Sequence, residues 1–251
     1  MDQAWIDAFH ETGFAKVEGL ADDETLAAIK SAISDGLRPP LAPLEYESEV
    51  GYPGAPGSLA EAGGRTPRRL LQAFARDRVF RDWGMHPEIV SRLKALFGTE
   101  RIMLSQNHHN CIMTKNPRFS TRTGWHRDMR YWCFDRSELI SVWLAIGPER
   151  EENGALQVIP GSHQMKMGRG SYDANLFFRE DLDENLALLE TAQTVSLEPG
   201  DVLFFDALTL HAAGKNMTDQ TKYSLVYTYH REDNQPIPET KSARYEDIPL
   251  W

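Results

Sequence analysis

Apolar residues at the start of the chain are spaced as on helix faces. From Trp5 onward they recur at helical spacing until Gly13, a typical helix end, and residues 14–20 have the pattern of a short strand. Asp22 is a favoured N-cap for a second amphipathic helix, which ends at Gly36. The first part of the chain therefore predicts the order helix, strand, helix.

Beyond residue 101 the apolar positions come in short runs separated by turns. Pro160-Gly161 and Pro199-Gly200 are typical turn sequences. Many short strands with such turns indicate a mainly β fold, either a sandwich or a jelly-roll barrel, flanked here by the N-terminal helices. We expect strands at 102–114, 139–146, 155–159, 194–197, 202–205 and 223–229, with a helical insert at 181–189.

Residues 36–66 interrupt this pattern with closely spaced prolines and glycines. A loop of this length inside a compact domain is typical of a lid or a binding loop. We expect 36–66 to form a mobile cover over a pocket.

Length and charge narrow the class of protein. A chain of 251 residues with 41% hydrophobic content can bury one large core, so we expect a single domain over 1–251. The net charge of −10 argues against nucleic-acid binding. The densest basic cluster, Arg65 with Arg68 and Arg69, suffices for one anionic group, although a solvated loop is the simpler interpretation.

The expected compartment is the cytoplasm. Cys111 and Cys133 give no disulfide framework, and the acidic N-terminal segment lacks the apolar stretch of a secretory signal. No run approaches the roughly 18 apolar residues of a membrane span. We expect a small-molecule partner and no membrane partner, while the sequence leaves the oligomeric state open.

One candidate site has the residue types of a metal centre. His126 and Asp128 lie two positions apart, so on a strand both side chains project from one face, and His211 follows a second strand-like run. Two imidazoles and one carboxylate are the facial triad of non-haem Fe(II) oxygenases. Chance alone gives roughly one His-x-acid pair in this composition, and the chain has three: His86-x-Glu88, His126-x-Asp128 and His230-x-Glu232.

Four segments resemble those of one enzyme family. They are the opening Phe9-x-x-x-Gly13-Phe14, then GWHRDMRYW around His126, NGALQVIPGSH, and EPGDVLFFD ahead of His211. Over nearly the whole chain this set is similar to the phytanoyl-CoA dioxygenase family of Fe(II)/2-oxoglutarate oxygenases. The resemblance implies a double-stranded β-helix, a cupin-like jelly roll with iron at its open mouth.

The resemblance also implies the site and its reaction. His126, Asp128 and His211 would be the catalytic iron ligands, with 2-oxoglutarate and O₂ at the remaining positions. The products would be succinate, CO₂ and a substrate hydroxylated at an unactivated C–H bond. Halogenases of this family replace the acidic ligand by Ala or Gly, so Asp128 favours hydroxylation.

Two positions depart from the family pattern for binding 2-oxoglutarate. The family places a basic residue, usually Arg, eleven positions after the distal His; here that residue is Lys222. Lys offers a point charge where Arg offers a planar fork. Ala213 stands where the family often has Ser. We expect Lys222 to bind the cosubstrate less selectively than Arg would.

The strand before the motif should supply polar groups to the other end of the cosubstrate. If residues 102–114 form one strand, Gln106, His108 and Asn110 share one face, and His109 lies on the other with Cys111 and Met113. A slip of one residue would exchange the faces. We favour Gln106, His108 and Asn110 because that face is polar, although both histidines suit ordinary hydrogen-bonded strand positions equally well.

Three residues after the metal motif are candidates for substrate contact. Arg130 suits an acidic substrate group, whereas Tyr131 and Trp132 suit core packing as well as a substrate. His163 is interpreted as a loop anchor, because the family motif contains it without metal binding.

Two other functions remain open at this point. Lys222 and Ala213 would also fit a non-catalytic jelly-roll protein that binds a metal or ligand. A cupin-like metalloenzyme that needs no keto acid is the other alternative. The fold does not determine the substrate.

Overall fold

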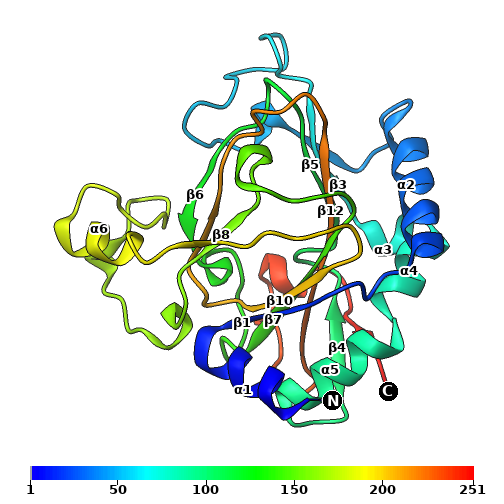
Figure 1. Cartoon of the computed structure of the whole chain (residues 1–251), viewed down its shortest axis with the longest axis vertical. Helices are drawn as coiled ribbons and strands as arrows, with labels where there is room; N and C mark the ends of the chain where they lie inside the picture. Colours follow the sequence, from blue (N-terminus) through cyan, green and yellow to red (C-terminus); the bar gives the residue numbers. More distant parts are fainter. Residues whose placement is uncertain (1) are drawn as a thin grey trace.

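The computed structural model describes residues 2–251, which form two antiparallel sheets arranged as a jelly roll (Figure 1). The larger sheet has nine strands, in the order β1-β10-β7-β12-β5-β3-β2, and β4 pairs with both β12 and β13. Its strands are β1 (Phe14–Val17), β2 (Leu44–Tyr46), β3 (Pro67–Leu71), β4 (Ile102–Ser105), β5 (Cys111–Lys115), β7 (Leu139–Ala145), β10 (Val202–Asp206), β12 (Lys222–Arg231) and β13 (Ile248–Pro249). The smaller sheet, in the order β6-β11-β8-β9, comprises β6 (Thr123–His126), β8 (Leu156–Val158), β9 (Gln193–Thr194) and β11 (His211–Ala213). The fold class is the predicted double-stranded β-helix.

Strand β12 shows how residue alternation separates the apolar core from the polar interior of the barrel. Leu225, Tyr227 and Tyr229 belong to the main apolar cluster, which the helices also line. Lys222 and Ser224 project to the opposite face, between the sheets, because successive strand side chains alternate. The functional site lies on this inner face.

Most of the helices cover the outer face of the larger sheet. In Figure 1, α2, α3 and α4 lie beside it, while α6 projects from the opposite side of the molecule. The helices are α1 (Gln3–Thr12), α2 (Asp23–Leu37), α3 (Ala73–Arg76), α4 (Arg78–Gly84), α5 (Pro87–Phe97) and α6 (Asp183–Leu189). Gly13 ends α1 with a left-handed backbone at φ 86°, and the Asp22 carboxylate caps α2 by accepting from Thr25 N at 2.8 Å. Both predicted N-terminal helices are confirmed.

Two strand predictions are wrong in their extent. The run 102–114 is not one strand, because residues 106–110 leave the sheet between β4 and β5. The run 194–197 forms a strand only as far as Thr194. Strands β2, β3 and β13 and helices α3 and α4 were not predicted.

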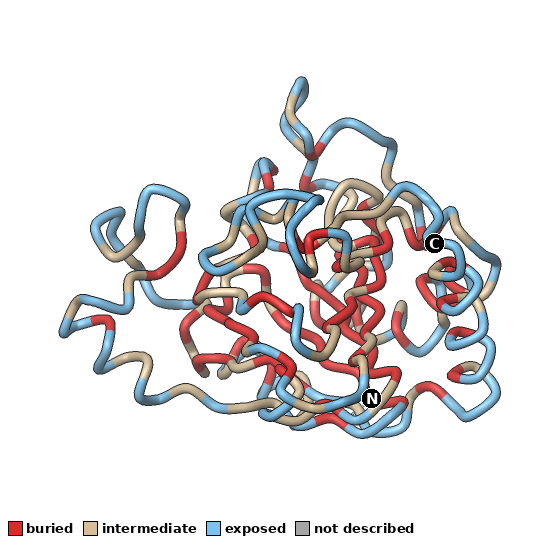
Figure 2. The backbone as a smooth tube through the Cα atoms, turned by 90° about the horizontal axis from the view of Figure 1, so that it is seen from above, coloured by how far each residue is buried: buried red, intermediate tan, exposed pale blue. Residues whose placement is uncertain are grey.

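The Pro- and Gly-rich segment 36–66 is partly tied to the barrel. It contains β2, which pairs with β3, and a 3-10 turn at Glu47–Glu49. The Glu47 carboxylate is fully buried and bonds Arg68 at 3.0 Å. Figure 2 shows buried backbone concentrated at the centre of the molecule, with exposed segments around it. The buried Glu47 therefore anchors segment 36–66 to the barrel.

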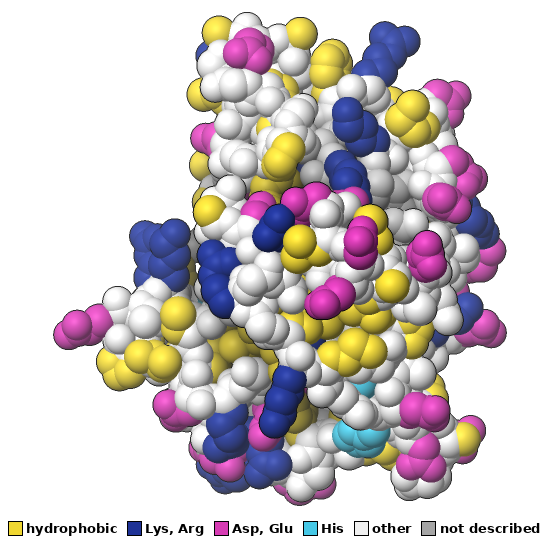
Figure 3. Space-filling model, turned by 90° about the vertical axis from the view of Figure 1, so that its left-hand side faces the viewer, with side chains coloured by type: hydrophobic (Ala, Val, Ile, Leu, Met, Phe, Trp, Pro, Cys, Tyr) yellow, Lys and Arg dark blue, Asp and Glu magenta, His cyan; other side chains and the backbone are white. Residues whose placement is uncertain are grey.

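The molecular surface is mixed in character. On the face to which α6 belongs, basic side chains are interspersed with hydrophobic ones (Figure 3).

Within residues 2–251, no helix has both the length and the apolar character needed to cross a membrane.

Candidate metal centre and adjoining cavity

His126, Asp128 and His211 come together because two short strands of the smaller sheet pair in register. His126 ends β6 and His211 begins β11, and the two lie directly opposite in the antiparallel pair. Arg127 keeps an extended backbone at φ −107° and ψ 140°, so Asp128 projects to the same side as His126 although it begins a 3-10 turn.

The three buried side chains direct their ligand atoms at one point. Nε2 of His126 lies 3.8 Å from Oδ1 of Asp128, and Nε2 of His211 lies 3.7 Å from the same oxygen. All three candidate ligand atoms lie within 4.8 Å of one another. Two imidazoles and a carboxylate on one side of a metal leave the other side open to exchangeable ligands.

Backbone carbonyls fix the orientation of both imidazoles. Nδ1 of His126 lies 2.8 Å from Gly124 O, and Nδ1 of His211 lies 3.0 Å from Thr209 O. A carbonyl only accepts, so each Nδ1 carries the proton and each Nε2 keeps its lone pair for a metal. Burial, together with the neighbouring His211, lowers the pKa of His126 well below its ordinary value. The ring is therefore neutral, as a metal ligand must be.

Asp128 has one oxygen held by the protein and one left free. Oδ2 accepts from Ser141 Oγ at 3.3 Å and lies 3.4 Å from His109 Nδ1. Oδ1 is buried and has no hydrogen-bond partner among residues 2–251. A buried carboxylate oxygen without a partner is costly unless a cation compensates it. The residues present therefore fit a divalent iron ion.

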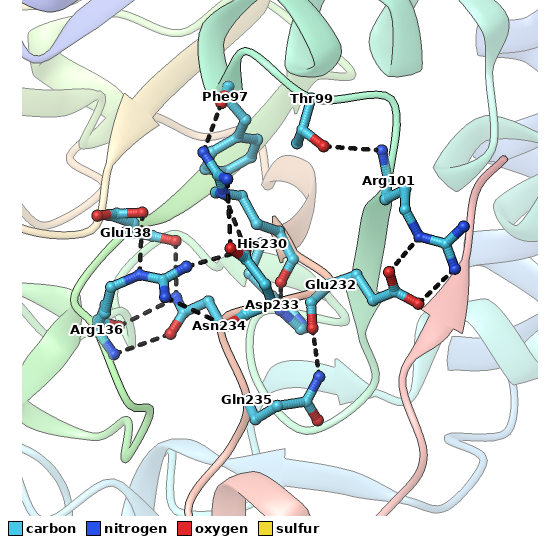
Figure 4. Close-up of polar contacts among 11 residues, drawn as sticks. Phe97, Thr99, Arg101, Arg136, Glu138, His230, Glu232, Asp233, Asn234 and Gln235 are labelled. Carbon is cyan, nitrogen blue, oxygen red and sulfur yellow. Dashed lines mark hydrogen bonds and ion pairs between the residues drawn. The ribbon is translucent and has the colours of Figure 1, made fainter.

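The other two His-x-acid pairs have structural roles. Glu88 lies in the first turn of α5, where an acidic side chain complements the helix dipole. His230 Nε2 bonds Asp247 Oδ2 at 2.9 Å. Glu232 pairs with Arg101 at the end of β12 (Figure 4).

A cavity extends from the triad between the two sheets and has a basic lining. The cationic side chains that line it are Arg68, Arg69, Lys115 and Lys222, and Ala213 also borders it. Arg68 is 5% exposed, so its interpretation as part of a solvated loop is wrong. The cavity can accept an anionic ligand.

Lys222 lies in this cavity but is already engaged by a carboxylate. Its ammonium donates to Glu149 Oε2 at 2.8 Å and to Ser224 Oγ at 3.3 Å. Glu149 is fully buried, and its other oxygen accepts from Trp143 Nε1 at 2.9 Å and Ser224 Oγ at 2.6 Å. An ammonium has three N–H groups, so Lys222 keeps one for a ligand.

The structure directs Gln106, His108 and Asn110 away from the triad. Gln106 Nε2 donates to Glu246 O at 2.6 Å, and His108 Nε2 lies 2.7 Å from Ser242 Oγ. The Asn110 side chain accepts from the backbone of Phe74 at 2.8 Å.

The predicted face of this stretch is therefore wrong. His109 and Met113 line the triad cavity, whereas Gln106, His108 and Asn110 border an adjoining hollow. The C-terminal segment draws residues 106–108 out of the sheet and so breaks the alternation on which the prediction depended.

The candidate substrate residues differ in their surroundings. Trp132 is buried, with its ring 5.2 Å from that of His109. Tyr131 is 41% exposed, lines the triad cavity, and shares a hydrogen bond of 3.1 Å with the Tyr52 hydroxyl. The Arg130 guanidinium lies 3.6 Å from the centre of the Phe177 ring. Its Nη1 is buried without a hydrogen-bond partner among residues 2–251.

Several residues at the site were not predicted. Lys115, Glu149 and Tyr52 gave no local signal, because the contacts that bring them to the cavity join distant segments of the chain. His109 was considered and placed on the other face. His163 Nε2 lies 3.1 Å from His10 O, which agrees with its predicted role as a loop anchor.

Together, the jelly roll and its buried triad define the class of non-haem iron oxygenases. Residues 9–224 match the family model described as phytanoyl-CoA dioxygenase (PhyH). The chain belongs to this family of 2-oxoglutarate-dependent oxygenases, whose cofactors are iron, 2-oxoglutarate and O₂.

Curated relatives agree with this assignment. A probable phytanoyl-CoA dioxygenase of Caenorhabditis elegans is 26% identical over 65% of this chain, which spans only 54% of that relative's length. The human peroxisomal phytanoyl-CoA dioxygenase is 24% identical, with 96% of this chain and 71% of that protein covered.

Solved structures share the fold. EctD from S. alaskensis, solved with 2-oxoglutarate and 5-hydroxyectoine, superposes with a TM-score of 0.79 at 19% identity and covers 98% of this chain and 85% of its own. The epimerase SnoN, solved with Fe³⁺ and alpha-ketoglutarate, has a TM-score of 0.74 at 20% identity and covers 94% and 86%. One neighbour was solved with 5-hydroxyectoine and another is an epimerase, so the fold alone does not select the reaction.

Proposed function

We propose that this chain is an Fe(II)- and 2-oxoglutarate-dependent hydroxylase of an unactivated C–H bond in a small anionic metabolite, releasing succinate and CO₂. The observation that carries the proposal is the complete triad with its unpartnered Asp128 Oδ1. His126, Asp128 and His211 would hold the iron. When bound, iron and 2-oxoglutarate supply the activation of O₂.

The protein's contribution is to orient the side chains that would hold the iron. Gly124 O and Thr209 O fix the two imidazoles, while Ser141 Oγ donates to the outer oxygen of Asp128 and is itself hydrogen-bonded to His109 Nδ1. Such outer contacts orient metal ligands and tune affinity. Asp128 favours hydroxylation over halogenation because it fills the position that a halide would need.

Binding of 2-oxoglutarate is assigned to the basic part of the cavity, including Lys222. Its remaining N–H can reach a ligand while Glu149 holds the ammonium in place. Gln106, His108 and Asn110 have no part in this assignment, since their polar groups serve the C-terminal segment and the backbone of Phe74.

The anionic character of the substrate follows from Arg130. Its guanidinium stacks on aromatic rings, and its buried Nη1 lacks an acceptor among residues 2–251. A carboxylate or phosphate would satisfy this donor. Tyr131 would border the substrate, whereas Trp132 serves as support beneath His109.

The domain organisation and the compartment are part of the same proposal. We propose that residues 1–251 act as one domain, with the part of 36–66 around Tyr52 covering the cavity. Cys111 and Cys133 are both free thiols, which suits a reducing compartment such as the cytoplasm.

The test is spectroscopic and needs no substrate. Fe(II) and then 2-oxoglutarate are added without oxygen, and a visible charge-transfer band is expected by analogy with the family. Admission of air should then release succinate. Bound iron with no band on adding 2-oxoglutarate would exclude the keto-acid-dependent reaction. A His211→Ala variant, which lacks one ligand, is the control and should give neither signal.

The substrate class has its own assay. Succinate release is compared for small acids and for their neutral amides or esters. We expect acids to stimulate the wild type, and Arg130→Met to lose that preference while keeping iron. Equal stimulation by neutral compounds would contradict the anionic substrate.

A further inference from the structure

The basic lining of the cavity is almost completely paired with internal carboxylates. Among residues 2–251, the four lining cations include three with a carboxylate partner. These pairs are Arg68–Glu47 at 3.0 Å, Arg69–Glu45 at 2.9 Å and Lys222–Glu149 at 2.8 Å.

Lys115 is the exception. Its buried ammonium donates to backbone carbonyl oxygens, those of Thr121 at 3.4 Å, Ala213 at 3.5 Å and Gly214, and to no carboxylate among residues 2–251. Carbonyl dipoles compensate a buried charge only in part. The charged form of Lys115 therefore still lacks a counter-charge.

The sheet register places Lys115 beside Lys222. The two are direct partners in the antiparallel β5–β12 pair, so their side chains share one face of the sheet. Like charges opposite each other destabilise a sheet. Glu149 compensates one of these two ammonium groups, so this wall is short of one negative charge.

We propose that the distal carboxylate of 2-oxoglutarate supplies the missing negative charge. It would bind beside the ammonium of Lys115, which has no internal counter-charge among residues 2–251. Lys222, held by Glu149, is a second donor whose charge is already balanced. The inference rests on the proposed function and assigns one binding subsite within it. The binding energy then depends on Lys115, although Lys222 has the position that the family pattern marks.

Proton uptake is a corollary of this charge balance. Burial, with the nearby cations Arg68 and Lys222, lowers the pKa of Lys115 well below its ordinary value, against the opposing effect of Glu47 and Glu149. A bound carboxylate favours the charged ammonium. Binding of 2-oxoglutarate should therefore take up protons, and calorimetry in buffers of different ionisation enthalpy measures this uptake.

The decisive experiment compares two keto acids on two proteins. The ligands are 2-oxoglutarate and 2-oxopentanoate, which has the same carbon chain without the distal carboxylate. Binding is measured by calorimetry on the Fe(II)-loaded protein without oxygen. Lys115→Met removes the positive charge and should weaken 2-oxoglutarate binding by about 10- to 100-fold, the lower part of the range for close charge pairs across interfaces, and leave 2-oxopentanoate binding nearly unchanged.

A second variant tests the charge count by rescue. Glu149→Gln removes the internal carboxylate and leaves Lys222 without its counter-charge. The double variant Lys115→Met/Glu149→Gln should therefore bind 2-oxoglutarate more tightly than Lys115→Met alone. Lys215→Met, an exposed lysine in the turn after β11, is the matched control and should bind both ligands as the wild type does.

Each result supports or overturns the assignment. Unchanged 2-oxoglutarate affinity in Lys115→Met, an equal loss for both keto acids, or no rescue by Glu149→Gln would overturn it. Intact iron binding in each variant shows that the fold persists. If the wild type itself fails to bind 2-oxoglutarate, the proposed function fails instead, so the two failures are distinguishable.

Discussion

His126 and His211 face each other directly across the β6–β11 pair, with their ring centres 4.3 Å apart. The pairing joins residues far apart in the chain, so the metal centre exists only once the smaller sheet has formed. Asp128 adds the third ligand from the turn that follows β6. The integrity of this centre and of its supports can be tested residue by residue.

Removal of the carboxylate ligand should abolish tight iron binding. Asp128→Ala leaves two neutral imidazoles, and we expect the affinity for Fe(II) to fall by more than about 100-fold, beyond the usual loss from an outer-shell partner. Anaerobic metal titration measures it. Glu232→Ala is the matched control, since Glu232 is the acid of another His-x-acid pair and bonds Arg101. Equal losses in both variants would contradict the assignment of the site.

The local part of this site could be predicted from sequence. His126 and Asp128 are two positions apart in extended backbone, so their common direction depends only on strand alternation. The register of β11 against β6 is a long-range property, and His211 could be placed only through the motifs around it.

The rest of the cavity depends on contacts that no local pattern records. The segment 106–110 leaves the sheet because the C-terminal segment bonds it, as Gln106 does with Glu246 and His108 with Ser242. Glu149, in the connection between β7 and β8, forms an ion pair with Lys222 on β12. Local sequence propensity contains no information on the C-terminal segment or on Glu149 as partners. The face of 102–114 and the pairing of Lys222 therefore could not be predicted.

Loss of the Ser141 hydrogen bond to Asp128 should weaken iron binding less than loss of Asp128 itself. Ser141→Ala removes the hydroxyl that donates to Oδ2 and should lower Fe(II) affinity by about 10-fold, within the range for outer-shell partners. The same anaerobic titration measures it. Ser105→Ala removes another fully buried strand hydroxyl, one with no contact to the triad, and should leave affinity unchanged. Equal Fe(II) affinities for Ser141→Ala and Ser105→Ala would show that Ser141 does not orient the Asp128 ligand.

Replacement of Asp206 by Asn should stabilise the protein by an amount that depends on pH. Burial raises the pKa of its carboxyl to about 6, although Leu208 N donates to it at 2.8 Å. The folded state holds this proton more tightly than the unfolded state, so folding loses stability as pH rises from about 4 to about 6. Asp206→Asn keeps an acceptor without the charge. It should stabilise by roughly 1–3 kcal/mol at neutral pH and by little near pH 4.

Chemical denaturation of wild type and variant across this pH range measures the difference for Asp206→Asn. Asp173→Asn is a suitable control, because Asp173 also accepts backbone N–H groups but lies exposed on a loop. A gain for Asp206→Asn that does not change with pH would mean that charge burial is not its cause.

Gly13 links the first helix to the loop that precedes His211, and its substitution should destabilise the fold. A Cβ added there would lie 2.5 Å from both His163 Nδ1 and Thr209 Oγ1, at a backbone φ of +86°. Gly98 also ends a helix at positive φ (+63°), but a Cβ there would meet nothing within 4 Å. Gly98→Ala should therefore cost about 1 kcal/mol for the backbone alone. Gly13→Ala should cost roughly 1–3 kcal/mol more, because overpacking is added to the same backbone penalty. Denaturant midpoints of the two variants measure this difference, and equal midpoints would show that the contact with Thr209 and His163 relaxes without cost.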